Sequence, residues 1–441
     1  MKQLKGVPTF LLAIKFIFTT GYRCLYPLAS IVASRYDSIT TANVAVVLAT
    51  MQFVNMFGSF LSTSAQNMMG MSKLICVCLF AEGCLTLMMA FSTTFYILAT
   101  AIILLGVTKG FLFPTILAFT NSLFDKEVQG VTVGYIEIAW GLSSLVGMPI
   151  VGLTMNVDFR LPFVCLAILC MLLCMFGFCF FKSRKLWHLD GHDDAGATKD
   201  SGASVQDMVV SNDAYIVDRE EHDLDRFGVM HDFYHIIHSI LHTPLAFSIV
   251  TSTITTMMSM YIMFLSFGIW LVQTHGYNAA EVGIATLTVG AADLLAEFSL
   301  IKVLKHFDHV KFLVVAQSCL MCSYFFLAFA LRPGSNIAIG LGAVFCTFYF
   351  FEMIIVGQMG LIGRVRLHVQ SGNDKGNGTF PAANFICSAL GCVIGSLLGP
   401  VIWNYGNSGP GIVGFATSLL NFSIWIIYYR RHGQDKNIVK A

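Results

Sequence analysis

The sequence contains little charge. Only 12% of its 441 residues are Asp, Glu, Lys or Arg, whereas 56% are apolar. Soluble domains carry about 25% charged residues, so this composition argues against a chain of ordinary soluble domains and indicates a membrane protein.

The sequence also lacks the motifs of several catalytic and nucleotide-driven classes. It has no G-x-x-x-x-G-K-[ST] phosphate-binding loop and no H-E-x-x-H zinc motif. Its 13 cysteines show no ligand spacing with histidine, although Cys319 and Cys322 form a single C-x-x-C, and most are expected to be small packing residues. We therefore predict neither an enzyme nor a cofactor, and no nucleic-acid partner.

Long apolar runs fill most of the chain. A bilayer core about 30 Å thick needs about 20 apolar residues per helix, and twelve runs have about this length. Six lie in the first half, at Phe10–Val32, Ala42–Leu61, Leu74–Phe91, Tyr96–Phe119, Val131–Met155 and Leu161–Phe181. Six lie in the second half, at Leu245–Val272, Val282–Leu304, Phe312–Leu331, Ile337–Leu361, Phe380–Trp403 and Gly411–Tyr428. The first run has no A-x-A-like cleavage site, so we expect it to be retained.

The two sets of six runs repeat each other. Pro149 in the fifth run and Pro400 in the eleventh each follow closely spaced glycines. Between the sets, Lys182–His242 carries 12 Asp and Glu against 6 Lys and Arg, and its Gly-, Ser- and Asp-rich part cannot bury enough apolar surface to fold. We predict an all-α membrane protein with one six-helix bundle at residues 1–181, a mostly disordered linker at 182–242, and a second bundle with a short tail at 243–441.

The distribution of basic residues predicts the orientation. With both termini and the linker on one side, the opposite side receives only Arg35, Arg160 and Arg332. Because basic residues concentrate in cytoplasmic loops, we expect both termini in the cytoplasm. The N-x-T sequon at Asn377 would then face the cytoplasm and carry no glycan.

Several motifs resemble those of the major facilitator superfamily of secondary transporters, and the resemblance covers essentially the whole chain. Gly106–Pro114 and Gly141–Gly152 look like that family's glycine-rich fourth and fifth helices, and Asp158–Phe163 looks like its W-R-x-P-F. Gly290–Glu297 is similar to the G-x-A-E-L-x-G-E of efflux members. The resemblance implies two pseudo-symmetric six-helix bundles and solute transport by alternating access.

One segment departs from the family pattern. The loop between spans two and three usually reads G-x-L-x-D-R-x-G-R-R, a charged latch between helices. Here Ser62–Lys73 keeps Gly70 and Lys73 but has Asn67 where the acid is expected. The resemblance therefore implies a weaker latch.

Ionisable side chains at membrane depth are costly unless they face a cavity or a partner, so each is a functional candidate. The runs contain seven such groups: Arg23, Glu82, Lys109, Glu137, Asp293, Glu297 and Glu352. Lys15 lies near the end of its run, where its side chain can reach the interface. In the resembled fold the third span lies outside the cavity, so Glu82 is expected to be a packing or interfacial residue.

The remaining charges fall into two groups with different expected roles. Arg23 and Lys109 suit a carboxylate or phosphate of a substrate, with Arg23 as the bidentate anchor, and Pro27 can break the span just beyond Arg23. Further substrate-binding candidates are Gln52, Asn55, Trp140 and Asn384. Because carboxyl groups in a low-dielectric cavity can exchange protons at neutral pH, the candidates for proton coupling or charge pairing are Glu137, Asp293, Glu297 and Glu352. The alternative is simple salt bridging, above all between Lys109 and Glu137.

A histidine pattern precedes the seventh run. His231, His235, His238 and His242 share one face of a helix near residues 230–242, with isoleucines opposite. We expect an amphipathic helix on the membrane surface. Histidines at this spacing can bind zinc, but a polar face that happens to be histidine also explains the pattern, so we predict no metal site here.

These observations predict a monomeric, multi-pass membrane protein that moves a small organic solute, with an organic anion or zwitterion favoured, in exchange or together with protons. Its partners would be the solute, protons and the lipid bilayer. Two alternatives stay open, which are a proton-driven exporter of a neutral sugar or drug-like compound and a non-transporting membrane receptor of the same fold.

Overall fold

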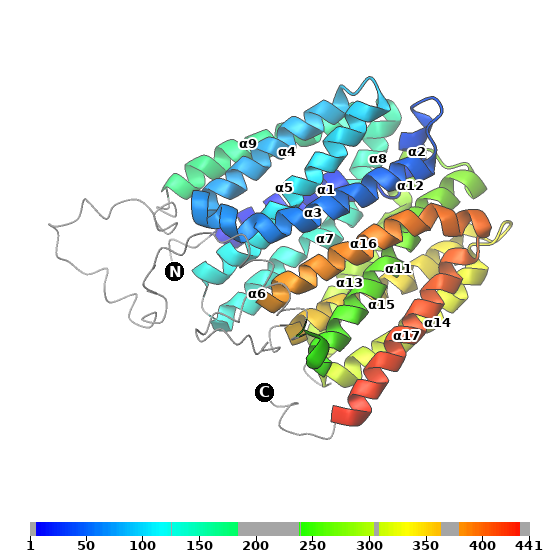
Figure 1. Cartoon of the computed structure of the whole chain (residues 1–441). Helices are drawn as coiled ribbons and strands as arrows, with labels where there is room; N and C mark the ends of the chain where they lie inside the picture. The colour runs from blue at the N-terminus through cyan, green and yellow to red at the C-terminus, as the bar shows by residue number, and fades with distance from the viewer. Residues whose placement is uncertain are drawn as a thin grey trace.

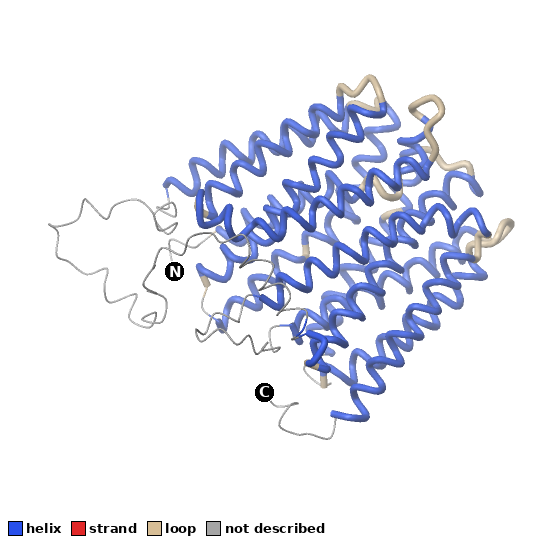
Figure 2. The backbone as a smooth tube through the Cα atoms, in the orientation of Figure 1, coloured by secondary structure: helices blue, strands red, loops and turns tan. Residues whose placement is uncertain are grey.

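The computed structural model describes residues 6–124, 126–183, 238, 240–303, 308–362 and 379–432. Within these ranges the chain is helical, and short loops join the helices (Figures 1 and 2). The absence of strands among the described residues fits a lipid environment, where a helix satisfies its backbone hydrogen bonds internally.

The helices of the first half build six membrane crossings. They are α1 (Val7–Arg23), α2 (Ala29–Ser34), α3 (Thr41–Met69), α4 (Met71–Ala90), α5 (Phe95–Leu123), α6 (Lys126–Glu137), α7 (Ala139–Leu142), the π-helical segment η2 (Ser143–Gly147), α8 (Met148–Val157) and α9 (Leu161–Ser183). Helices α6 to α8 with η2 form one crossing, the fifth.

The helices of the second half build the other six. They are α11 (Pro244–His275), α12 (Ala279–Ala285), α13 (Leu287–Val303), α14 (His309–Ala330), α15 (Ile337–Ile362), α16 (Thr379–Tyr405) and α17 (Gly409–His432). Helices α12 and α13 form one crossing, the eighth.

Eleven helical segments in the described part are long and apolar enough to cross a bilayer. The twelfth crossing is the first, which α1 and α2 make together with 17 and 6 residues. The break at Cys24–Leu28 contains Pro27, which has no backbone N–H and disfavours a helical residue before it. Several backbone hydrogen bonds at the break join residues three apart instead of four, such as the bond from Tyr26 N to Arg23 O at 3.3 Å. The twelve predicted spans and the break at Pro27 are therefore confirmed.

The packing repeats from one half to the other. In the first half α3 packs on α5 and α4 packs on α9; in the second, α13 packs on α15 and α14 packs on α17. The contacts between halves are related in the same way, because crossing two meets crossing eleven (α3 with α16) and crossing five meets crossing eight (α8 with α12). Figure 1 shows α4 and α9 on one flank, α14 and α17 on the other, and α3 beside α16 between them. The all-α fold of two pseudo-symmetric six-helix bundles is as predicted.

Glycines allow the closest of these approaches. A Cβ atom on Gly106 of α5 would lie 2.1 Å from the Met51 carbonyl oxygen of α3, and one on Gly268 of α11 would lie 2.0 Å from that of Pro27. Small residues at such contacts let helices pack without help from a hydrophobic driving force, which lipid removes. The contact between Gly268 and Pro27 joins the break in the first crossing to the second half of the molecule.

Most of the predicted linker lies outside the described residues, and so do His231 and His235. Of the predicted amphipathic helix, His238 and residues 240–242 are helical, with His238 and His242 exposed and Ile240 buried. The Nε2 atoms of the two described histidines lie 3.1 Å apart.

Candidate functional site

The centre of the molecule holds an ion pair between the two halves. Nη2 of Arg23, at the end of α1, donates to Oδ2 of Asp293 on α13 at 2.9 Å. Arg23 is 3% exposed and Asp293 is fully buried. The pair joins residues 270 positions apart, so it is a contact between the first and second bundles.

The fifth crossing supplies a further acceptor for Arg23. Its Nη1 donates to the Trp140 carbonyl oxygen at 3.0 Å, and this oxygen also accepts from the Ser143 hydroxyl at 2.8 Å. Trp140 lies just before the π-helical segment, where widened turns alter the usual backbone bonding. The guanidinium also lies over the rings of Trp140 and Phe264, 5.3 and 5.4 Å from their centroids.

Unpaired carboxyl oxygens surround this ion pair. Oδ1 of Asp293 and both carboxyl oxygens of Glu297, one turn further along α13, are buried without a hydrogen-bond partner in the described part of the chain. Glu352 on α15 interacts electrostatically with Asp293, Glu297, Arg23 and Glu137. The structure thus brings together the four predicted acids around the predicted cationic anchor.

Lys109 on α5 lies in a polar and aromatic setting. Its Nζ donates to Oε1 of Gln52 at 2.9 Å and lies 4.2 Å from the ring centroid of Tyr22. The amide nitrogen of Gln52 donates to the Tyr26 hydroxyl at 2.7 Å, and Asn55 donates to Gln52 at 3.4 Å. Lys109 is therefore a buried cation without a carboxylate partner among the described residues.

Glu137 pairs with Lys15 rather than with Lys109. The Lys15 Nζ lies 2.5 Å from Oε2 of Glu137 and over the rings of Phe113 and Trp140. Lys15 is only 6% exposed, so the expectation that its side chain reaches the membrane interface is wrong. The face of α1 that carries it, with Lys15, Thr19 and Arg23 four residues apart, turns toward the inside of the molecule, where Lys15 meets the fifth crossing.

Two further candidates lie apart from this centre. Asn384 on α16 accepts from the Thr253 hydroxyl at 3.0 Å, in a network of neutral polar groups on α11, α15 and α17. Glu82 on α4 is 1% exposed and lies inside the first half, against α1. It is therefore not an interfacial residue, and its surroundings are described below.

Three tyrosines lie at the centre, and sequence reasoning gave Tyr22 no role. Tyr22 and Tyr26 lie close together on the first crossing, and the ring of Tyr261 on α11 lies 4.8 Å from that of Tyr26. For Tyr22 the position next to Arg23 was the only available signal, and it is weak in a chain with 14 tyrosines and 38 phenylalanines.

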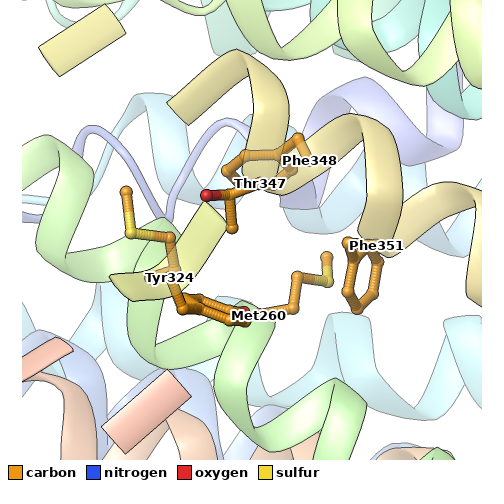
Figure 3. Close-up of a pocket in the computed structure, with 6 residues that line it drawn as sticks. Met260, Tyr324, Thr347, Phe348 and Phe351 are labelled. Atoms are coloured by element: carbon orange, nitrogen blue, oxygen red, sulfur yellow. The ribbon is translucent and has the colours of Figure 1, made fainter. Parts of the chain in front are cut away.

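A small recess lies near these groups in the second half (Figure 3). Its empty volume is about 140 Å³ and its lining comprises Met260, Met263, Tyr324, Thr347, Phe348 and Phe351. Pockets for organic ligands occupy about 300–1,000 Å³. This recess is too small and too apolar to hold a charged solute in the conformation described.

The comparisons agree with this architecture. The family model of the Major Facilitator Superfamily matches residues 11–396. Among solved structures, the chain is similar to the xylose transporter XylE from E. coli in a partially occluded, inward-open conformation, with a TM-score of 0.68, 12% identity and 98% of each chain covered. No curated protein matches the sequence. At that identity the structural likeness concerns the fold alone. The family match, in contrast, covers most of the chain. The chain is thus a multi-pass membrane protein that belongs to the major facilitator superfamily.

Proposed function

We propose that this protein is a proton-coupled secondary transporter of a small organic anion or zwitterion that works by alternating access. The observation that carries the proposal is the Arg23–Asp293 ion pair between the two halves, with unpaired carboxyl groups beside it. No covalent bond is made or broken in such a cycle.

Charge balance suggests how the pair would be used. Separating Arg23 from Asp293 in a low-dielectric interior leaves two uncompensated charges, which costs several kcal/mol. A substrate carboxylate on Arg23 together with a proton on Asp293 compensates both charges at once. The two halves can then part only when solute and proton are both bound, which is the condition for coupled transport.

The other charged groups support the same assignment. Lys109 offers the substrate a second cation, 4.2 Å from the ring of Tyr22, which is the residue next to Arg23. The Tyr22 ring also contacts the rings of Phe113 and Trp140, and the three provide contact surface for apolar parts of a solute. Glu297 and Glu352 can receive the proton that Asp293 releases. Glu137 is assigned to charge pairing with Lys15.

Uptake into proteoliposomes tests the proposal. We expect Arg23→Ala to lower uptake of an organic anion or zwitterion by at least about tenfold, because a substrate group loses its buried charged partner. Arg332→Ala is the matched control, since Arg332 is exposed in a loop. Asp293→Asn should weaken the dependence of the remaining uptake on a pH gradient.

The solute panel separates the alternatives. It contains carboxylates, phosphate esters, amino acids, a neutral pentose and an amphipathic amine. Equal anion uptake by Arg23→Ala and wild type would contradict the anchoring role. Uptake of only the pentose or the amine would show that the substrate is a neutral sugar or a drug-like compound instead of an anion or zwitterion. The absence of any uptake would favour a receptor of this fold.

A further inference from the structure

Glu82 is a buried carboxyl group that the charge pairs of the centre do not use. It lies midway along α4 and is 1% exposed. Its carboxyl touches α1, because a Cβ atom on Gly21 would lie 3.1 Å from Oε1 of Glu82. Gly21 is two residues before Arg23, so this contact is adjacent to the central site but on the opposite face of α1.

The surroundings of Glu82 provide no compensating charge. Oε2 has no hydrogen-bond partner in the described part of the chain, and neither of the two ion pairs found there involves Glu82. The titratable groups that interact with it are the thiols of Cys78 on α4 and Cys170 on α9. From α1 it meets Gly21, and among the described residues α5 contributes no charge that acts on it.

An ionised carboxylate in this position would be an isolated charge away from water. Such a state is strongly unfavourable, so a group of this kind binds a proton instead. This differs from Asp293, whose charge is compensated by Arg23. Ionisable residues that persist in lipid without a partner are candidates for proton binding.

The contact with α1 links the Glu82 carboxyl to the helix that carries Arg23. Helix α1 ends two residues after Gly21, at the break that meets α11 through Gly268. A shift of α1 away from α4 would open the carboxyl to water from the centre. Because Gly21 has no side chain, the carboxyl and α1 can lie in direct contact in the conformation described.

We propose that Glu82 is a second proton-binding site, separate from the Asp293 group. It holds its proton while α1 is packed against α4 and releases it when α1 moves away. The coupling to α1 rests on the proposed transport cycle, whereas the bound proton does not.

Infrared spectroscopy of the protein in liposomes tests the bound proton directly. The C=O stretch of a protonated carboxyl group should be present in wild type at neutral pH and reduced in Glu82→Gln. Glu281→Gln is the control, because Glu281 is exposed at the start of α12, and this variant should lose no such band. An unchanged band in Glu82→Gln would overturn the proposal. Glu82→Asp covers the case in which the glutamine variant does not fold, since its band should persist at a shifted frequency, and an unshifted band would overturn the proposal as well.

Transport measurements test the coupling. Because the amide introduced by Glu82→Gln cannot release a proton, uptake driven by a pH gradient should fall by about tenfold, while solute exchange at equal pH stays within about twofold of wild type. Equal loss in both assays would show a structural effect and contradict the coupling. If the infrared band depends on Glu82 but no solute of the panel is transported, the proton site stands and the proposed function fails.

Discussion

At the scale of single residues, the charged groups at the centre of the molecule divide into those with and those without an oppositely charged partner. Arg23 and Asp293 form one pair and Lys15 and Glu137 another, whereas Lys109, Glu297 and Glu352 have no oppositely charged partner within hydrogen-bond distance among the described residues. Charged groups in lipid that are paired with an opposite charge hold helices together, and those without such a partner are candidates for binding a ligand or a proton. In the proposed cycle, Lys109 can therefore bind a further substrate group, and Glu297 and Glu352 can bind protons, without breaking an ion pair.

The Arg23–Asp293 pair predicts a specific pattern of stability. Arg23→Ala or Asp293→Ala alone should lower the free energy of unfolding by about 3–5 kcal/mol, because each leaves a buried charge without its partner. The double variant Arg23→Met with Asp293→Leu should be more stable than either single variant. Thermal unfolding in detergent measures this, with Arg332→Ala expected within about 0.5 kcal/mol of wild type. A double variant whose loss equals the sum of the two single losses would contradict the pairing.

At the scale of helices, the broken first crossing and α11 close one end of the site. The break at Cys24–Leu28 lies against Gly268, and Cys24, Leu25 and Tyr26 are fully buried. Residues outside regular helix at membrane depth need such cover. This contact connects the two halves directly after Arg23, within the first crossing.

Gly268→Ala should open this contact. The added methyl would collide with the Pro27 carbonyl, and overpacking of this kind costs about 1–3 kcal/mol. Maleimide labelling of Cys24, followed by mass spectrometry of its peptide, should then become about tenfold faster or more.

Gly342→Ala is the matched control for this experiment, because an added Cβ at Gly342 meets no atom within 4 Å. Equal labelling of Cys24 in wild type and Gly268→Ala would show that the contact does not hold this end closed.

At the scale of the whole molecule, twelve crossings place the start of α1 and the end of α17 on the same side of the membrane. The basic residues of the described loops follow this division, with Arg35, Arg160 and Arg332 at the opposite end. From the positive-inside rule we predict that the side of the termini is the cytoplasm.

Cysteine accessibility in intact cells checks this orientation. A membrane-impermeant maleimide should label Asn336→Cys, in the loop between α14 and α15, from outside. It should label Ser64→Cys, near the end of α3, only after the membrane is permeabilised. Both positions are exposed, and wild type corrects for the native cysteines. The reverse pattern would place the termini outside.

The sequence by itself determined the number of crossings, the break at Pro27 and which apolar runs carry ionisable groups. Lipid enforces these features residue by residue, through the length of apolar runs and the cost of buried charge. Only the tertiary structure decided the partners, since it pairs Glu137 with Lys15 instead of Lys109, joins Arg23 to Asp293, and separates Asn384 and Glu82 from the centre. The physical reason is that periodicity along a helix indicates at most which of its faces turns inward, whereas the partner of each side chain on that face follows from how the helices pack against one another.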